Sequence, residues 1–328
     1  MSSIGNARPQ SATGTDDLRL IARISRMYHE QGLRQTEIAN RLHLSQTRVS
    51  RLLQKAVELG IVRTVVTLPE GVHAELEETL EQRYGLEEVV VADVHESDGS
   101  PLRALGAAAA HMLEVTLGEG DVVGISSWSE TLLSAVNSMR PLRGTGAEAV
   151  VQLVGGRGSP RVQVLATGML ERLGALLGAP THFLLTPAVL GSAQARNELL
   201  RDRALQDVIE AWDRITVALV GIGNVRMSPM LAQSGVPQEA TDRQALEAAG
   251  AVGDVCLRYF DSDGDAVKTD FDRRVLAIDE TRLKRIPRRI GVAGGLDKHR
   301  AVRAAILGGW INVLITDSEL AHELANGE

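Results

Sequence analysis

Cysteine, aromatic residues and long apolar runs are all scarce in this chain of 328 residues. The single cysteine, Cys256, excludes an internal disulfide framework and any zinc or iron–sulfur site built from several cysteines. Aromatic residues make up 3% of the chain, which disfavours a lectin that stacks sugars or a protein that stacks single-stranded bases. The sequence has no run near the ~18 apolar residues of a spanning helix, and its first residues lack the apolar core of a signal peptide. We therefore expect a cytoplasmic protein with no membrane partner.

The composition that remains is that of an ordinary globular protein with an uneven distribution of charge. Hydrophobic residues are 44% and charged residues 23% of the chain, and the length allows two or three domains. Residues 1–68 carry a net charge of +5, whereas residues 69–328 carry −12. A small basic end on a large acidic body is typical of a head that binds a polyanion.

The basic end contains three segments with apolar residues at helical spacing. The first begins at Asp16 and ends before Gly32, the second surrounds Ile38, and the third begins at Ser45 and has Gly60 as its C-cap. Two short helices with a tight turn between them are what a helix-turn-helix motif requires. A generic helical hairpin with a solvated basic face would produce the same pattern, so both interpretations remain open at this point.

Changes in composition and a Pro-Glu-Gly segment predict the domain boundaries. Residues 1–15 are small and polar without periodicity, which indicates a disordered lead-in. Residues 63–68 form a β-branched run typical of a strand, and Pro69, Glu70 and Gly71 follow it. We expect a DNA-binding domain over residues 16–68 and a larger domain over residues 72–328.

The third helical segment carries the side chains suited to reading DNA. Ser45 can cap the helix, whose first turns then present polar and basic residues. Gln and Arg can read base edges with paired hydrogen bonds, whereas Ser, Thr and further Arg side chains more often hold phosphates. The predicted DNA-binding residues are Gln35, Ser45, Gln46, Thr47, Arg48, Ser50 and Arg51.

Beyond Gly71 apolar strand candidates alternate with helical stretches, which predicts an α/β domain with a doubly wound, mostly parallel sheet covered on both faces. Ligands of such sheets bind beyond the carboxyl ends of the strands. Small-residue turns follow several strands, at residues 124–127, 155–158, 221–223 and 294–295. The strand candidates are residues 88–94, 121–126, 149–154, 215–221, 255–260, 290–294 and 312–317.

The ordered set of motifs along the chain resembles the SorC-type family of sugar-responsive transcriptional regulators. The resemblance covers most of residues 18–325. It rests on Leu33 to Ala39, Val49 to Leu53 and Gly60 to Val62 in the head, and on Val151 to Gly156, Val220 to Gly223, Gly250 to Asp254, Phe260–Asp261 with Gly264, Gly291 to Gly295 with Lys298, and Ile311 to Asp317 in the body.

The resemblance implies an N-terminal helix-turn-helix that binds operator DNA and a C-terminal effector domain similar to sugar-phosphate isomerases. Members of the family bind DNA as oligomers, commonly tetramers, and usually sense a phosphorylated sugar. We therefore expect this chain to form a dimer or tetramer and to use no cofactor. This chain has Arg34 where the family often has Thr, so we expect the Thr-x-x-Glu capping box with Glu37 to be lost.

The first turn of the effector domain departs from the Trp-Gly-x-Thr pattern of the family. Ser129 replaces the glycine, and Glu130 adds a carboxylate where an anion would dock. Glu130 either points away and complements the helix dipole, or points inward and accepts hydrogen bonds from hydroxyl groups. A neutral polyol or unphosphorylated sugar therefore stays open beside a sugar phosphate.

Lys298 is the strongest effector candidate in the body, because only four lysines occur beside 31 arginines. The alternative interpretation of Lys298 is a solvated residue at the start of a helix. Asp261 is a further candidate, and its alternative interpretation is a residue of a turn at the end of a strand. The full predicted effector site is Ser127, Ser129, Glu130, Thr131, Gly155, Gly156, Arg157, Gln163, Gly221, Gly223, Asp261 and Lys298.

Other functions fit the sequence less well. A sugar-phosphate isomerase needs a positioned acid and base, and the eight histidines are scattered. Gly221 and Gly223 are followed by Arg226 where a dinucleotide-binding motif has its third glycine. No sequence motif indicates a metal site. A purely structural oligomeric protein is the third class, and it would not retain DNA.

Overall fold

The computed structural model describes residues 15–62, 72–94, 101–142, 146–156, 160–225 and 240–327. The chain forms two compact units, with the division between Thr67 and Leu68. The strand expected over residues 63–68 lies outside the described residues, as do residues 1–14 of the expected lead-in.

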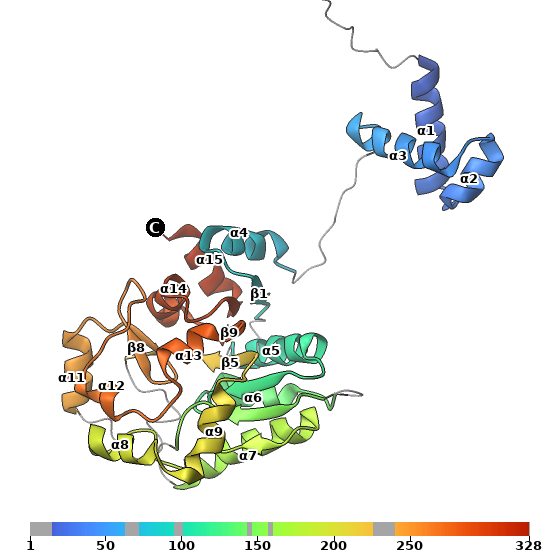
Figure 1. The fold of residues 1–328 in the computed structure, drawn as a ribbon. Helices are drawn as coiled ribbons and strands as arrows, with labels where there is room; N and C mark the ends of the chain where they lie inside the picture. The colour runs from blue at the N-terminus through green and yellow to red at the C-terminus, as the bar shows by residue number, and fades with distance from the viewer. Residues whose placement is uncertain are drawn as a thin grey trace, which may run out of the picture. The chain divides into compact units, whose positions relative to one another are not determined.

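The N-terminal unit packs three helices around a small apolar core (Figure 1). The helices are α1 (Thr15–His29), α2 (Gln35–Leu42) and α3 (Gln46–Glu58). Ile24, Ile38 and Val49, one from each helix, are fully buried. The periodic apolar positions of the sequence therefore face one another, and the polar positions face outward.

The turn between α2 and α3 is closed at both ends by local structure. His43 ends α2 in the left-handed conformation, with φ of 54°. Ser45 caps α3, because its Oγ accepts a hydrogen bond from the backbone N–H of Arg48 at 3.3 Å. The predicted Ser45 cap is confirmed, whereas the C-cap of α3 is Leu59 and not Gly60, which follows it with φ of +68°. These caps fix where α3 begins and therefore which side chains its first turn presents.

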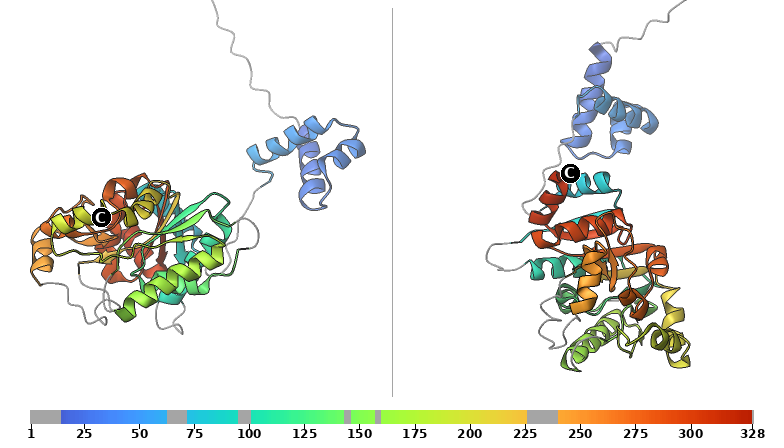
Figure 2. Two further views of the ribbon diagram at one scale, coloured as in Figure 1. Left: turned by 60° about the horizontal axis from the view of Figure 1, so that its bottom comes forward. Right: turned by 90° about the vertical axis from the view of Figure 1, so that its left-hand side faces the viewer.

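The C-terminal unit is built on a parallel sheet (Figures 1 and 2). Within the described residues it has seven strands in the order β1-β10-β9-β5-β2-β3-β4, with parallel pairing throughout. The strands are β1 (Glu88–Ala92), β2 (Val122–Ile125), β3 (Ala149–Gln152), β4 (Thr181–His182), β5 (Val217–Gly221), β9 (Arg288–Val292) and β10 (Val313–Asp317).

Both faces of this sheet are covered by helices, as the doubly wound prediction requires. Successive residues of β2 show this, since Val122 belongs to one apolar cluster and Val123 to the other. One face packs against α5 (Leu102–Thr116), α6 (Glu130–Ser138) and α7 (Pro160–Leu177). The other face packs against α4 (Ala74–Tyr84), α9 (Arg203–Trp212), α13 (Glu280–Arg285), α14 (His299–Leu307) and α15 (Ser318–Asn326).

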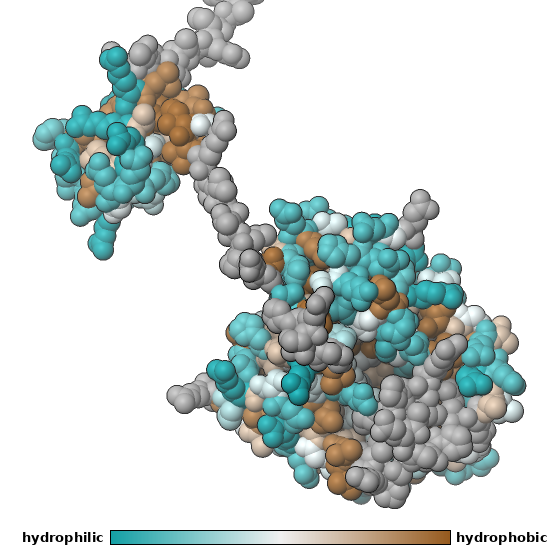
Figure 3. Space-filling view, turned by 180° about the vertical axis from the view of Figure 1, so that it is seen from behind, coloured by the Kyte–Doolittle hydropathy of each residue, from teal (hydrophilic) through white to brown (hydrophobic). Residues whose placement is uncertain are grey.

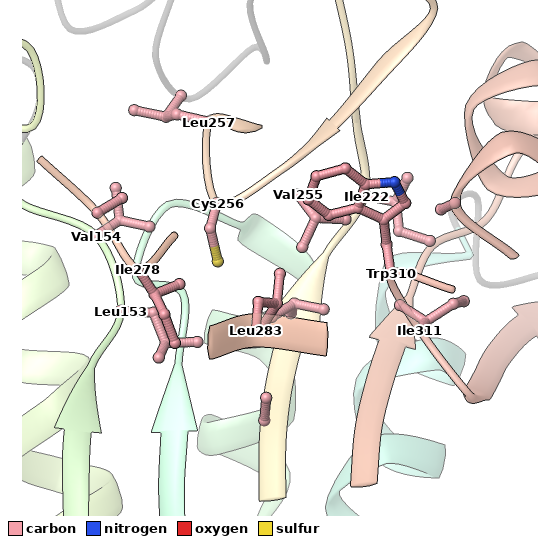
Figure 4. Close-up of a cluster of buried hydrophobic side chains, with 14 of the residues drawn as sticks. Leu153, Val154, Ile222, Val255, Cys256, Leu257, Ile278, Leu283, Trp310 and Ile311 are labelled. Atoms are coloured by element: carbon pink, nitrogen blue, oxygen red, sulfur yellow. The ribbon is translucent and has the colours of Figure 1, made fainter. Parts of the chain in front are cut away.

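The prediction of one strand over residues 255–260 is wrong, because this segment is part of a small antiparallel sheet. Residues 255–260 do not form one strand, because β7 (Gly253–Val255) and β8 (Arg258–Phe260) are joined by a turn at Cys256 and Leu257. Both turn residues have positive φ, 55° and 61°, as a two-residue hairpin demands. Burial of their side chains among the apolar residues of Figure 4 holds this turn, although neither is Gly or Asn. The third strand is β6 (Gly223–Asn224), which pairs with β7.

The remaining elements of the described residues are short. They are α8 (Ala193–Leu199), α11 (Ala240–Ala248), α12 (Asp270–Arg274) and the 3-10 turn η2 (Leu296–Lys298). Hydrophilic side chains cover much of the face of the body drawn in Figure 3, with apolar ones in small groups. None of the helices in the described part of the chain is long and apolar enough to cross a membrane.

Candidate DNA-binding and effector sites

The outward face of α3 and its cap gathers most of the residues predicted to bind DNA. Six of the seven predicted residues are exposed, and Gln35 at the start of α2 is half-buried. Arg48 and Arg51 have no carboxylate partner among the described residues, unlike Arg26 of α1, which pairs with Glu30 at 2.9 Å. Two unpaired guanidinium groups on one exposed helix are the donors that phosphates and base edges accept. The exposed residues are Ser45, Gln46, Thr47, Arg48, Ser50 and Arg51.

The start of α2 keeps half of the capping box that we expected to be lost. Arg34 makes no side-chain cap, since a guanidinium group has no hydrogen-bond acceptor. The carboxylate of Glu37, however, accepts a hydrogen bond from the backbone N–H of Arg34 at 2.7 Å. The substitution of Thr by Arg therefore removes only one of the two reciprocal bonds.

The carboxyl edge of the large sheet has its topological switch point between β2 and β5. The chain runs from β2 outward through β3 and β4, then returns to β5 on the other side of β2 and continues outward to β9. At this point Ser126 Oγ accepts a hydrogen bond from the backbone N–H of Gly221 at 3.4 Å. Crevices outside such a switch point are the usual ligand sites of open α/β sheets.

Ser127 lies in this region but is only 1% exposed, and it is held by a residue that the sequence analysis missed. Gln152, at the end of β3, donates from Nε2 to Ser127 Oγ at 3.3 Å and to the carbonyl of Val154 at 2.8 Å. Its Oε1 accepts from the backbone N–H of Leu184 at 2.9 Å. Gln152 belongs to the Val151 to Gly156 motif of the resemblance. Its position at the end of a predicted strand is the feature of the sequence that could have identified it as a site residue.

The turn after Ser127 starts α6 rather than leaving a flexible loop. Ser129 caps α6, with its Oγ accepting from the backbone N–H of Leu132 at 3.4 Å. A Cβ atom on Gly221 would lie 3.0 Å from Cβ and Oγ of Ser129. A residue with a side chain at position 221 would therefore crowd Ser129. Glu130 and Thr131, the first residues of α6, are half-buried, which leaves part of each side chain accessible.

Gly155 and Gly156, in the turn after β3, make hydrogen bonds within the protein. The backbone N–H of Gly155 donates to Leu276 O at 3.1 Å, and that of Gly156 donates to Thr186 O at 2.6 Å. The backbone N–H groups of these two predicted effector-site residues are therefore already used within the protein. Gln163 of α7 is exposed near Gly156, and Arg157 lies outside the described residues.

Lys298 lies beside the carboxyl end of β5. Its Nζ donates to the carbonyl of Ile222 at 2.6 Å. Burial lowers the pKa of the Lys298 ammonium, while the nearby carboxylates of Asp254 and Asp297 act in the opposite direction. A buried ammonium group interacts more strongly with an anion or hydroxyl group that approaches it than an exposed lysine does, because water screens it less.

Asp254 of β7 is a second residue that the sequence analysis did not select. A Cβ atom on Gly223 would clash with its carboxylate, so Gly223 is needed for close approach. The other carboxylate oxygen accepts from the backbone N–H of Leu257 at 3.0 Å. Asp254 belongs to the quoted Gly250 to Asp254 motif, but only the pairing of β6 with β7 places it near Lys298.

The structure does not bring Asp261 to Lys298. The Oδ1 atom of Asp261 accepts from the backbone N–H groups of Asp263 and Asp265, both at 3.0 Å, in the strand-end turn given as its alternative. Gly264 of that turn lies against the C-terminal end of α14, whereas Lys298 immediately precedes the N-terminus. The two ends of this helix are about 13 Å apart at 1.5 Å per residue.

The glycine turn before Lys298 is fixed by a buried carboxylate. Asp317, at the end of β10, is 3% exposed. One of its oxygens accepts from the backbone N–H of Gly295 at 2.6 Å, and the other caps α15 by accepting from Leu320 N–H at 2.8 Å. The position of Lys298 is therefore set by β10 as well as by its own turn.

A helix-turn-helix unit joined to a doubly wound domain with a polar carboxyl edge defines a transcriptional regulator that responds to a small ligand. The Sugar-bind family, described as a sugar-binding domain, matches residues 71–326, and the IclR helix-turn-helix domain matches residues 27–65. The chain belongs to this family of sugar-binding transcriptional regulators, as the sequence resemblance predicted.

Relatives of known role match over nearly their whole length. The sorbitol operon regulator of Klebsiella pneumoniae is 32% identical, over 94% of this chain and 98% of that protein. The deoxyribonucleoside regulator of Bacillus subtilis is 32% identical, over 92% and 96%. The crystal structure of the full-length Klebsiella regulator matches with a TM-score of 0.69 and 30% identity, over 95% of this chain and 100% of that one.

Proposed function

We propose that this cytoplasmic regulator binds duplex operator DNA through α3 and changes its DNA affinity when a sugar, sugar phosphate or polyol binds at the carboxyl edge of β2 and β5. The observation that carries the proposal is Lys298, a desolvated amine placed at Ile222 beside Asp254. A cation and a carboxylate together can hold vicinal hydroxyl groups, and the cation alone can hold a phosphate.

Binding, rather than isomerisation, is the activity that these groups support. Two carboxylates at this edge, Asp254 and Asp317, already accept hydrogen bonds from backbone N–H groups, which fixes them as acceptors. A general base needs access to a substrate proton. An assay of ketose–aldose interconversion with the ligand that changes DNA affinity tests this, and turnover would overturn the assignment.

The DNA part of the proposal predicts a graded loss of affinity in α3. Changing Arg51 to Ala should weaken operator binding by about 1–3 kcal/mol if Arg51 reads a base, or lower the salt slope by about one if it holds a phosphate. Fluorescence anisotropy with duplexes from the region upstream of the regulator's own operon, at several salt concentrations, measures both quantities. Arg26→Ala, in a paired arginine of α1, is the matched control. Unchanged affinity and slope in Arg48→Ala, Arg51→Ala and the double variant would remove α3 as the reader.

The protein should act as a dimer or tetramer, because one helix of 13 residues contacts too little DNA for the usual operator affinity. Exposed apolar side chains on the head support such an association, and Figure 3 shows a group of them. Val57, Leu59 and Ile61, at and after the end of α3, are 58%, 44% and 39% exposed. A monomer at micromolar concentration by light scattering, with and without DNA, would contradict this prediction.

A further inference from the structure

A cavity of about 400 Å³ lies between β8, α8, α12 and the start of α13. None of the described residues that we predicted for the effector site is among those that line it. Its wall is rich in charge, with Arg196, Arg258, Lys268 and Arg273 as cations and Asp272, Asp279 and Glu280 as anions.

Each of the three acidic side chains of this wall already has a cationic partner. Asp272 accepts from Arg258 Nη1 at 2.7 Å, inside the cavity wall. Glu280 pairs with Lys284 at 2.9 Å, and Asp279 pairs at 3.1 Å with Arg282, which it shares with Asp213. Asp279 is therefore the one of the three whose charge is only partly balanced.

The other cations of the wall have no such partner. Arg196 donates from Nε to Val275 O at 3.2 Å and from Nη1 to the neutral side chain of Asn197 at 3.1 Å, so Nη2 has no acceptor among the described residues. Lys268 and Arg273 are exposed and make no ion pair within the described part of the chain. The wall thus keeps a surplus of positive charge after all its ion pairs are formed.

Arg258 fixes the floor of the cavity, and its charge is balanced by Asp272. Its side chain is 7% exposed and is held by the carbonyls of Ile278 and Ala277 as well as by Asp272. Burial, followed by the like charge of Arg258, lowers the pKa of the Arg196 guanidinium, although Asp272 and Asp279 oppose this. Arg196 and Arg258 line the same cavity, and two guanidinium groups on one wall favour an anion between them.

We propose that this cavity is a second ligand site, which takes a small anion with a phosphate or carboxylate group between Arg196 and Lys268, above Arg258. Its volume suits a small metabolite, since ligand pockets commonly span about 300–1,000 Å³. The proposal does not depend on the sugar site at Lys298.

The test is calorimetric titration of the full chain with inorganic phosphate, and separately with succinate, at constant ionic strength. It is run in the Lys298→Met background, so that the sugar site does not contribute phosphate binding. Arg196→Gln should weaken binding by about tenfold or more, as expected for the loss of a charged hydrogen bond. Lys268→Gln should weaken it by about twofold to fivefold, as for a partly exposed charge pair. Binding of phosphate but not succinate, or the reverse, identifies the group recognised.

The controls separate a folding defect and a general charge effect from loss of the site. Lys268 is exposed and makes no ion pair in the described residues, so its replacement leaves the fold intact. Arg203→Gln changes an exposed arginine at the start of α9, outside the cavity, and should leave binding unchanged. No binding of either anion in the Lys298→Met background, or equal binding in all three variants, would overturn the proposal without bearing on the sugar site.

Discussion

Replacing Gly264 by Ala is expected to destabilise the C-terminal unit by about 3 kcal/mol or more. Gly264 has φ of +85°, a conformation that L-residues rarely adopt. A Cβ atom there would also overlap backbone atoms of Ala304 and Gly308, which cannot move without unwinding the end of α14. Trp310 is tied to the same turn, since its Nε1 donates to Gly264 O at 2.8 Å.

Urea denaturation followed by tryptophan fluorescence measures this effect in the body alone, because Trp128, Trp212 and Trp310 all lie there. Gly85→Ala is the matched control, since Gly85 has φ of +68° but nothing within 4 Å of an added Cβ. The control should lose only the conformational cost, about 1–2 kcal/mol. Equal losses in the two variants would show that backbone overlap at α14 does not determine the stability of this turn.

Local sequence rules predicted the head well because its structure is set by neighbours in the chain. The Ser45 cap and the left-handed end of α3 at Gly60 each depend on a few adjacent residues. The body was predicted at the level of its parallel strands, because continuous apolar runs indicate burial on both faces. The two-residue strand β4 carries no such signal and was missed.

Tertiary contacts decided the features that sequence reasoning missed. The β7–β8 hairpin turns at Cys256 and Leu257, where no Gly or Asn marks a turn, because the core holds their side chains. The motifs of the resemblance contained both Asp254 and Asp261, yet only strand pairing shows that Asp254 is the one beside Lys298. Gly155 and Gly156 were predicted for the effector site, but their backbone N–H groups donate to the carbonyls of Leu276 and Thr186 from distant segments.

Loss of the Lys298 ammonium is expected to shift the ligand response to higher ligand concentrations, while operator affinity without ligand stays intact. Lys298→Met keeps most of the side-chain volume but removes the donor to Ile222 O and the charge beside Asp254. A phosphorylated ligand should lose about 1.5–3 kcal/mol of affinity and a neutral polyol about 0.5–1.5 kcal/mol. Titration of sugars, sugar phosphates and polyols against the DNA-bound protein measures the response, with Lys284→Met, in a lysine paired to Glu280, as the control.

The pH dependence gives an independent readout of the same group. Because burial lowers the pKa of Lys298 below its ordinary 10.5, the folded protein loses this charge at a lower pH than the unfolded chain does. The affinity for an anionic ligand should therefore decline as the pH rises toward 10.5 in the wild-type protein and stay flat in Lys298→Met.

Coupling between sites is reciprocal, so the wild type should also show lower ligand affinity on operator binding if the ligand releases DNA. A response of Lys298→Met at the same ligand concentration as the wild type would place the ligand elsewhere. Better binding of phosphorylated over neutral sugars in Glu130→Gln would show that the Glu130 carboxylate selects for a polyol.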